Sequence, residues 1–248
     1  MKCFGLTDKG KIREDNQDCF IIEKCEKKSC VIVALCDGMG GAKAGGLAST
    51  IANKTFVSFV YDKLTSRRRV TFNYRQILQD ACSEANRIAF DYSQFDESCK
   101  GMGTTIVGGL VFEDGSGKII NVGDSRAYFI SLRHKDIYQI TKDHSLVEDL
   151  VEYGAITKEQ ARTHPQKNVI TRAVGAEEDV DSDYFEFKLQ GSDMLLLCSD
   201  GLSNMVSDLE ILDYALEYSD PELLCRALMD KALNRGASDN VTVVAVAR

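Results

Sequence analysis

The chain has 248 residues, of which 44% are hydrophobic and 27% charged, so its composition is that of a globular protein and excludes intrinsic disorder and collagen-like structure. A chain of this length can bury about three quarters of its unfolded surface, so it needs no disulfide or metal ion to fold. Its 38 acidic and 30 basic residues give a net charge of −8, which argues against nucleic acid or an anionic membrane surface as a partner.

The first half of the chain alternates strand-like and helical patterns. An apolar run rich in β-branched residues predicts a strand over 30–36. Apolar residues at helical spacing then predict two long helices, one from Leu47 to Leu64 and one from Ile77 to Ala89. Further apolar runs predict strands over 104–112, 119–122 and 127–132.

Helix starts are marked in the second half of the chain. Ser145, Thr157 and Ser207 are each followed three residues later by Glu or Gln, the capping-box pattern of a helix N-terminus. Asp220 precedes Pro221 as a cap precedes a proline at the first helical position. Apolar runs predict two more strands, over 194–198 and 241–247.

Helices grouped between runs of strands favour an α+β fold over a regular βαβ alternation. No internal repeat, low-complexity tract or proline-rich linker divides the sequence, so we expect a single domain over residues 1–248. The segment 141–173 is polar and helix-capped, and we expect it to form an excursion from the sheet core.

The nine cysteines are scattered, and none has the C-x-x-C spacing of a zinc or redox site. Cys36 and Cys198 lie in apolar runs and are expected to be small buried hydrophobes. The first residues have no apolar signal-peptide core, and no apolar run approaches the roughly 20 residues of a membrane span. These observations predict a cytoplasmic protein with no membrane partner.

The aspartates carry the strongest functional signal, because five of them lie at the ends of apolar strands: Asp18, Asp37, Asp124, Asp200 and Asp239. If these carboxylates converge, they repel one another unless cations lie between them. Oxygen-only ligands favour Mg²⁺ or Mn²⁺, and two such ions roughly 4 Å apart can activate a water for attack on phosphorus. The glycines after Asp37 and Asp200 would allow close backbone approach, and the Gly38 carbonyl could itself bind an ion.

Each Asp-Gly pair taken alone is equally well explained as turn chemistry. The sequence does not show whether the five carboxylates meet. The hypothesis of a metal centre therefore depends on the whole set and not on one pair.

Eight short motifs extend the argument, because they occur in one order along the whole chain: Thr7–Asp18, Asp37–Gly41, Gly103–Thr105, Asn121–Arg126, Thr141–Ser145, Ile170–Gly175, Ser199–Gly201 and Ser238–Asn240. With these motifs the chain resembles the metal-dependent serine/threonine protein phosphatases of type 2C (the PPM family), in their bacterial single-domain form. The resemblance implies a four-layer αββα sandwich of two antiparallel sheets flanked by helices, with 141–173 as a flap beside the active site.

The resemblance also implies a role for each site residue. Asp37 would bridge two Mn²⁺ or Mg²⁺ ions, and the Gly38 carbonyl would bind one of them. The second ion's shell would be completed by Asp18, Asp200 and Asp239. A third, weaker ion would be held by Asp124 with Asp200.

Arg13 matches the family's phosphate-binding arginine, a role that suits a guanidinium because it can donate two parallel hydrogen bonds to a phosphate. The implied reaction is direct attack of a water that bridges the two ions on phosphoserine or phosphothreonine. The implied partners are phosphorylated proteins, including a serine/threonine kinase and its substrates, and we expect a monomer.

Two departures from the family pattern concern proton delivery. Bacterial members commonly have histidine where this chain has Ala42, and glutamate where it has Gly46. No metal ligand is lost, but the general acid is left unidentified. We expect His144, which lies in the flap-side motif, to be structural. The Arg67–Arg69 run is interpreted as a solvated helix end, with phosphoprotein docking as the alternative.

Two rival functions remain open at this stage. A non-catalytic phosphatase-like binding module is one, although such a module should have lost metal aspartates. A phosphatase dedicated to one small regulatory phosphoprotein is the other. A thiol mechanism is disfavoured, because no cysteine lies in the nucleophile loop that tyrosine phosphatases use.

Overall fold

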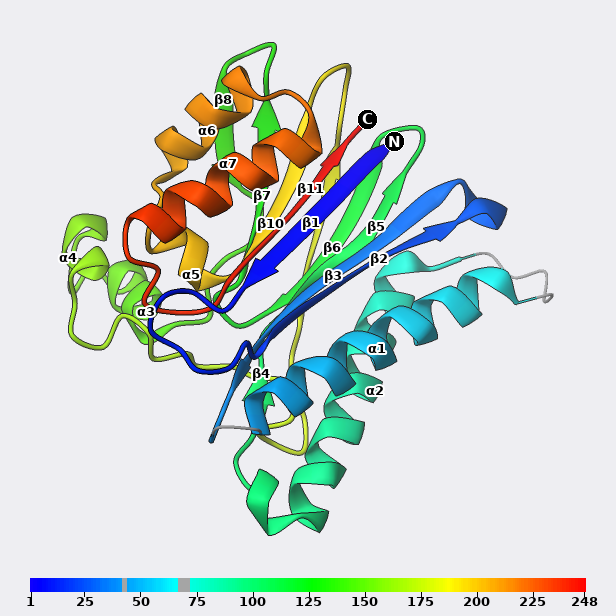
Figure 1. Ribbon diagram of the computed structural model, residues 1–248. Helices are drawn as coiled ribbons and strands as arrows, with labels where there is room; N and C mark the ends of the chain where they lie inside the picture. The colour runs from blue at the N-terminus through cyan, green and yellow to red at the C-terminus, as the bar shows by residue number, and fades with distance from the viewer. Residues whose placement is uncertain (42–43, 67–71) are drawn as a thin grey trace.

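The computed structural model describes residues 1–41, 44–66 and 72–248. Two antiparallel sheets face each other, and helices cover their outer faces (Figure 1). The β1 sheet has the strand order β1 (Lys2–Asp8), β11 (Val241–Ala247), β10 (Met194–Cys198), β7 (Arg126–Ser131) and β8 (Asp136–Gln139). The β2 sheet has the order β2 (Asp18–Cys25), β3 (Cys30–Met39), β5 (Ile106–Phe112), β6 (Ser116–Val122) and β9 (Asp183–Lys188), and β4 (Gly103–Thr104) pairs with β3.

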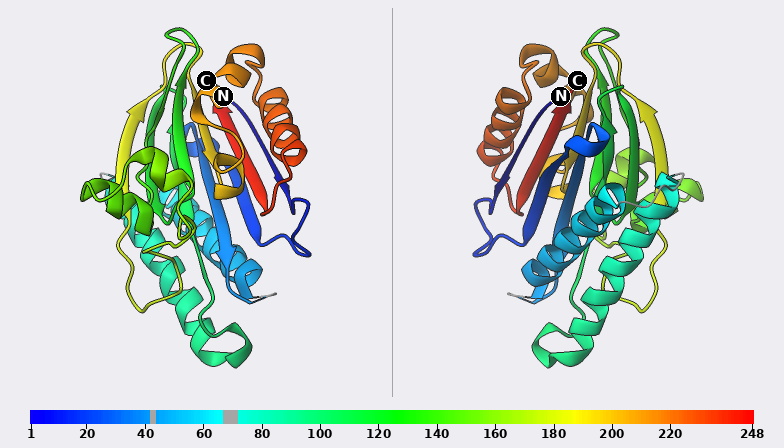
Figure 2. Two further views of the ribbon diagram at one scale, coloured as in Figure 1. Left: turned by 90° about the vertical axis from the view of Figure 1, so that its left-hand side faces the viewer. Right: turned by 90° about the vertical axis from the view of Figure 1, so that its right-hand side faces the viewer.

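The helices form the outer layers, which the side views of Figure 2 separate from the sheets. The outer face of the β2 sheet packs against α1 (Ala44–Thr65) and α2 (Tyr74–Phe95). The outer face of the β1 sheet packs against α5 (Asp200–Ser203), α6 (Asp208–Glu217) and α7 (Pro221–Asn234). The remaining helices are α3 (Leu146–Glu152), α4 (Lys158–Arg162) and two 3₁₀ turns at Glu26–Lys28 and Glu97–Cys99.

Alternation along the strands explains why they are apolar throughout. In β3, Val31, Val33 and Leu35 point into the space between the sheets. Their neighbours Ile32 and Ala34 point toward α1 and α2. A strand buried on both faces needs apolar residues at every position, so β3 is an uninterrupted apolar run.

The α+β fold and the four-layer sandwich are confirmed by this arrangement. All six predicted strands are present, and the 104–112 run is divided into β4 and β5. No strand was predicted over β1, β2, β8 or β9, although Asp18 was placed beside an apolar run. These four are the partly exposed edge strands of the two sheets, so their polar residues weaken the apolar pattern on which strand prediction depends.

Segment 141–173 lies outside the two sheets and contains α3 and α4 (Figure 1). Its two ends are held together by a bridge between Ser145 and Ile170. A flap over the active site remains a prediction for this segment, as does a single domain over the whole chain. Ala42 and the Arg67–Arg69 run lie outside the described residues.

All nine cysteines are free thiols, and seven are buried. The predicted burial of Cys36 and Cys198 is therefore confirmed. Within the described part of the chain, no helix is both long enough and apolar enough to span a membrane.

Candidate metal centre

Strand pairing brings Asp18 and Asp37 together. Asp18 begins β2, Asp37 lies near the end of β3, and the two residues are directly opposite each other in the antiparallel pair. Because β2 and β3 are joined by a short hairpin, the register that aligns their apolar faces also aligns these two carboxylates.

The other three aspartates approach from neighbouring elements. Asp200 begins α5 directly after β10, Asp239 lies just before β11, and Asp124 lies in the turn between β6 and β7. Burial raises the pKa of Asp37 well above its usual range, and the charges of Asp18, Asp200, Asp124 and Asp239 raise it further. The structure therefore brings together all five aspartates that the sequence analysis selected.

Asp18 is held by two hydroxyl groups from the opposite sheet. Its Oδ2 accepts hydrogen bonds from Ser199 Oγ (2.8 Å) and Thr242 Oγ1 (2.7 Å). Its Oδ1 is buried and has no hydrogen-bond partner. A buried carboxylate oxygen without a partner is costly, and burial raises the pKa of this group to about 6. Such an oxygen is suited to an ion.

The backbone around Asp37 is fixed by threonines of the neighbouring strand. Asp37 N–H donates to Thr105 Oγ1 (3.0 Å), and Thr104 Oγ1 donates to the Asp37 carbonyl (2.9 Å). Gly38 follows in a tight position, because an added Cβ would lie 2.1 Å from the Gly45 carbonyl oxygen. Gly38 in β3 must therefore be glycine, because the first turn of α1 packs directly against it.

Arg13 reaches the cluster from the exposed loop between β1 and β2. Its Nη2 donates to Asp239 Oδ2 at 2.8 Å. The loop is tied down by Asn240, whose Nδ2 donates to the carbonyls of Lys9 (3.0 Å) and Asp15 (2.9 Å). Sequence reasoning assigned Asn240 no role, although the Ser238–Asn240 motif contained it.

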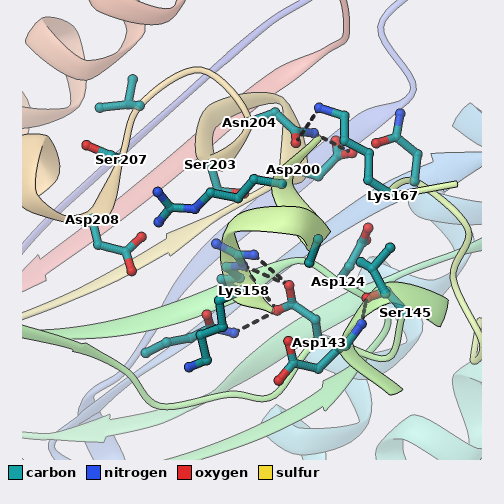
Figure 3. Close-up of a pocket in the computed structure, with 18 of the residues that line it drawn as sticks. Asp124, Asp143, Ser145, Lys158, Lys167, Asp200, Ser203, Asn204, Ser207 and Asp208 are labelled. Carbon is teal, nitrogen blue, oxygen red and sulfur yellow. Dashed lines mark hydrogen bonds and ion pairs between the residues drawn. The ribbon is translucent and has the colours of Figure 1, made fainter. Parts of the chain in front are cut away.

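Asp124 and Asp200 line a pocket of about 520 Å³ between the 141–173 segment and α5 (Figure 3). Burial, followed by the charge of Asp200, raises the pKa of Asp124 to about 8. Burial, followed by the charge of Asp239, raises the pKa of Asp200 to about 6. Asn204 Nδ2 donates to Asp200 Oδ2 (3.1 Å), and Lys167 Nζ from the 141–173 segment donates to Asn204 Oδ1 (3.2 Å).

The donor set fits hard divalent cations. It consists of oxygen atoms, among them a buried Asp18 oxygen without a partner, and oxygen donors suit Mg²⁺ and Mn²⁺. Among the described residues, no three or more Asp, Glu, His or Cys side chains are arranged so that they could hold a metal ion without rearranging. The ligand roles of Asp18, Asp37, Gly38, Asp124, Asp200 and Asp239 therefore remain a prediction.

Comparison with known proteins identifies the family. The protein phosphatase 2C family matches residues 9–234. The serine/threonine phosphatase stp of Listeria innocua is 39% identical over 245 residues, which cover 98% of this chain and 94% of the relative. Protein phosphatase PhpP of Streptococcus pneumoniae is 34% identical over 245 residues, which cover 97% of this chain and 95% of the relative.

Solved structures agree with the sequence matches. Serine/threonine phosphatase Stp1 from Staphylococcus aureus has a TM-score of 0.89 and 38% identity, covering 100% of this chain and 94% of that one. Serine/threonine phosphatase PstP/Ppp from Mycobacterium tuberculosis has a TM-score of 0.84 and 31% identity, and the match covers 98% of this chain and 97% of that one. The chain therefore belongs to the protein phosphatase 2C family of phosphoprotein phosphatases, as its eight ordered motifs predict.

Proposed function

We propose that this protein hydrolyses phosphoserine and phosphothreonine in proteins with the help of two Mn²⁺ or Mg²⁺ ions. The observation that carries the proposal is the convergence of five aspartates, one of which has a buried oxygen without a partner. The relatives called serine/threonine phosphatase stp in Listeria innocua and protein phosphatase PhpP in Streptococcus pneumoniae match nearly the whole chain, which supports the same substrate class here.

Asp37 would bridge the two ions, with the Gly38 carbonyl, Asp18, Asp200 and Asp239 as further ligands. Asp124 and Asp200 would hold a third, weaker ion. Bound at this place, such ions polarise the phosphoryl group and lower the pKa of a water that attacks phosphorus. Ser199 and Thr242 orient Asp18 so that its other oxygen is directed away from them, which keeps that oxygen available as a ligand.

Arg13 would bind the substrate phosphate. Only its Nη2 is engaged, by Asp239, and among the described residues neither Nε nor Nη1 has a hydrogen-bond partner. A guanidinium anchored at one nitrogen loses less freedom when its other nitrogens donate to phosphate oxygens. Asp239 would therefore orient Arg13 as well as bind an ion.

The cysteines support a mechanism without a thiol nucleophile. Burial raises the pKa of Cys82 and Cys198 to about 12 and raises that of Cys36 well above the usual range. A thiol with so high a pKa carries almost no thiolate at neutral pH and is a poor nucleophile.

The partners in this proposal are phosphorylated proteins, including a serine/threonine kinase and the substrates of that kinase. We further propose that the protein acts as a cytoplasmic monomer. The net charge of −8 remains an argument against nucleic acid as a ligand.

Phosphate release from phosphothreonine peptides tests the proposal. The protein should release phosphate with Mn²⁺, lose that activity with a chelator, and recover it when Mn²⁺ is restored. Asp193→Asn is the control for the loss of a buried aspartate outside the proposed metal centre, and it should keep the Mn²⁺-dependent activity. Asp193 directly precedes β10, at the opposite end of that strand from Asp200, and accepts hydrogen bonds from Ser131 and Gln190. Turnover that survives the chelator would contradict the metal mechanism, and absence of turnover with Mn²⁺ would favour the binding-module alternative.

A further inference from the structure

His144 is a buried histidine, 4% exposed, at the start of the 141–173 segment. It exchanges two hydrogen bonds with Gly123. The His144 N–H donates to the Gly123 carbonyl (3.0 Å), and the Gly123 N–H donates to His144 Nδ1 (3.1 Å). The residue that follows Gly123 is Asp124, so the histidine holds the peptide next to a candidate ligand.

The turn that carries Asp124 is held on both sides. Gly123 has a φ of +99°, and a Cβ there would lie 2.5 Å from Thr105 Cγ2, so the backbone packs directly on Thr105. On the other side of Asp124, the hydroxyl of Ser125 is hydrogen-bonded to Thr105 Oγ1 (2.7 Å). The same Thr105 oxygen accepts from Asp37 N–H. The threonine thus links Asp124 to the Asp37 strand, and His144 links it to the 141–173 segment.

The hydrogen bonds fix the tautomer of His144. Nδ1 accepts from a backbone N–H and therefore carries no proton. A ring whose Nδ1 is unprotonated is neutral and carries its proton on Nε2; burial, followed by the Arg172 guanidinium, lowers the pKa of His144, which acts in the same direction. Nε2 lies 3.3 Å from Asp183 Oδ2 at the start of β9 and 3.2 Å from Arg172 Nη1. Because the guanidinium has no acceptor atom, the Nε2 proton is directed to the Asp183 carboxylate. Arg172 Nη1 in turn donates to Asp183 Oδ1 (3.0 Å).

We propose that His144 is a positioning residue, which uses Nδ1 to hold the Gly123–Asp124 turn so that the Asp124 carboxylate lies beside Asp200. The proposal rests on the proposed role of Asp124 in holding the weaker third ion. It is comparable to the way outer groups orient metal ligands in other proteins, where their loss weakens metal binding about 10- to 100-fold. His144 itself would touch neither an ion nor the substrate.

Two amide substitutions separate this role from general packing. In His144→Asn the side-chain oxygen can occupy the place of Nδ1 and accept from Gly123. In His144→Gln the amide is one bond longer and occupies the place of Nε2, which leaves the Gly123 N–H without an acceptor. Both variants replace the ring with a polar side chain, so a purely structural role should affect the two to a similar extent.

Calorimetric titration with Mn²⁺ is the main measurement, made on the wild type, both His144 variants and Asp124→Ala. We expect His144→Gln to weaken the third ion about 10-fold or more, and His144→Asn to weaken it far less. Both variants should retain the tight pair of ions. Equal losses in the two variants, or no loss in either, would overturn the proposal.

A second measurement does not depend on the variants being folded. Long-range ¹⁵N correlation spectra of the wild type should show an unprotonated Nδ1 and a protonated Nε2 for His144. A proton on Nδ1 would overturn the proposal.

The titration also separates this proposal from the proposed function. If the wild type binds only two ions, or if Asp124→Ala keeps the third, the third-ion role of Asp124 is wrong and the positioning role falls with it, whereas the two-ion function stands.

Discussion

Asp37 is the residue on which the site depends most, because four other carboxylates raise its pKa in addition to burial. Asp37→Asn removes the charge that two ions would share. Such ions contribute several kcal/mol of transition-state stabilisation, so turnover should fall about 10³-fold or more. The metal-free variant should unfold at a higher temperature than the metal-free wild type at neutral pH, because a buried carboxyl that must either stay charged or take up a proton on folding is replaced by a neutral amide. Phosphopeptide kinetics and thermal unfolding, with and without Mn²⁺, measure both effects.

The control for this substitution is Asp193→Asn, a buried aspartate at the other end of β10. Activity per folded molecule should be normal in the control, whatever its stability. A folded Asp37→Asn protein with near-normal turnover would refute the two-ion hypothesis.

Arg13 should act mainly on substrate binding, since the phosphate is charged in both the ground state and the transition state. Hydrogen bonds to charged groups contribute about 1.5–3 kcal/mol, so Arg13→Ala should raise KM for a phosphopeptide by about 10- to 100-fold and change kcat less. Arg13→Lys should restore binding only in part, because an ammonium cannot replace the planar fork. An unchanged KM would show that Arg13 does not contact the phosphate.

At the scale of residues, the sequence pointed to the carboxylates that gather around Asp37, but not to the groups that hold them. Asp18, Asp37 and Asp200 could be found because each adjoins an apolar strand. The hydroxyls that orient Asp18 belong to Ser199 and Thr242, at the other end of the chain. Because these hydrogen bonds join residues that are far apart in the sequence, they leave no local sequence pattern. Only the structure could show them.

At the scale of elements, the two complete capping boxes should differ in their effect on stability. Thr157 caps α4, which has no buried residue, whereas Ser207 caps α6, which buries Ile211, Leu212 and Ala215. Loss of a cap costs about 1 kcal/mol. Ser207→Ala should therefore lower the global unfolding temperature by about 2–4 °C, because α6 unfolds only with the core.

Thr157→Ala should instead leave that temperature nearly unchanged and increase hydrogen exchange within α4 alone, because weakly packed elements open locally. Thermal unfolding and amide exchange of the two variants check this contrast. Equal decreases in melting temperature would show that α4 unfolds together with the core.

Strands were predicted correctly where nearly all of their residues are buried, and they were missed at the edges of the two sheets. β10 and β11 were predicted with their exact bounds because all or nearly all of their residues are buried. In β9 the residues Tyr184, Glu186 and Lys188 alternate with Asp183 and the phenylalanines on a partly exposed strand. Such a segment lacks a continuous apolar run, and its pairing with β6 is decided by tertiary contacts.

At the scale of the whole molecule, the order of strands could not be derived from local patterns. β1 pairs with β11, so the first and last strands of the chain lie side by side (Figure 1). That pairing places Arg13, just after β1, beside Asp239, just before β11. The resemblance to a family implied that Asp18 and Asp239 share an ion, but it did not predict this strand pairing.

The burial of these carboxyls, together with the charges around them, should govern how the stability of the metal-free protein depends on pH. The pKa is raised from 3.8 to about 6 for Asp18 and Asp200, and to about 8 for Asp124. A carboxyl with a higher pKa in the folded state binds its proton more tightly when folded. Its contribution to the free energy of unfolding is complete below about pH 4 and is lost as the pH rises through the folded pKa.

The melting temperature measured in a chelator should therefore fall between pH 5 and pH 8. Glu210 and Asp114, whose hydrogen bonds lower their pKa values to about 2, are ionised throughout this range and cannot cause the fall. Asp124→Asn should reduce the fall above pH 6 without removing it, because the pKa of Asp37 is also raised well above its usual range. Saturating Mn²⁺ should abolish or reverse the slope, because cations bind the ionised carboxylates and stabilise only the folded chain. A melting temperature that rises from pH 5 to pH 8 in the chelator would show that the pKa values of these buried carboxyls are not raised in the folded chain, and the case for ions between them would lose its physical basis.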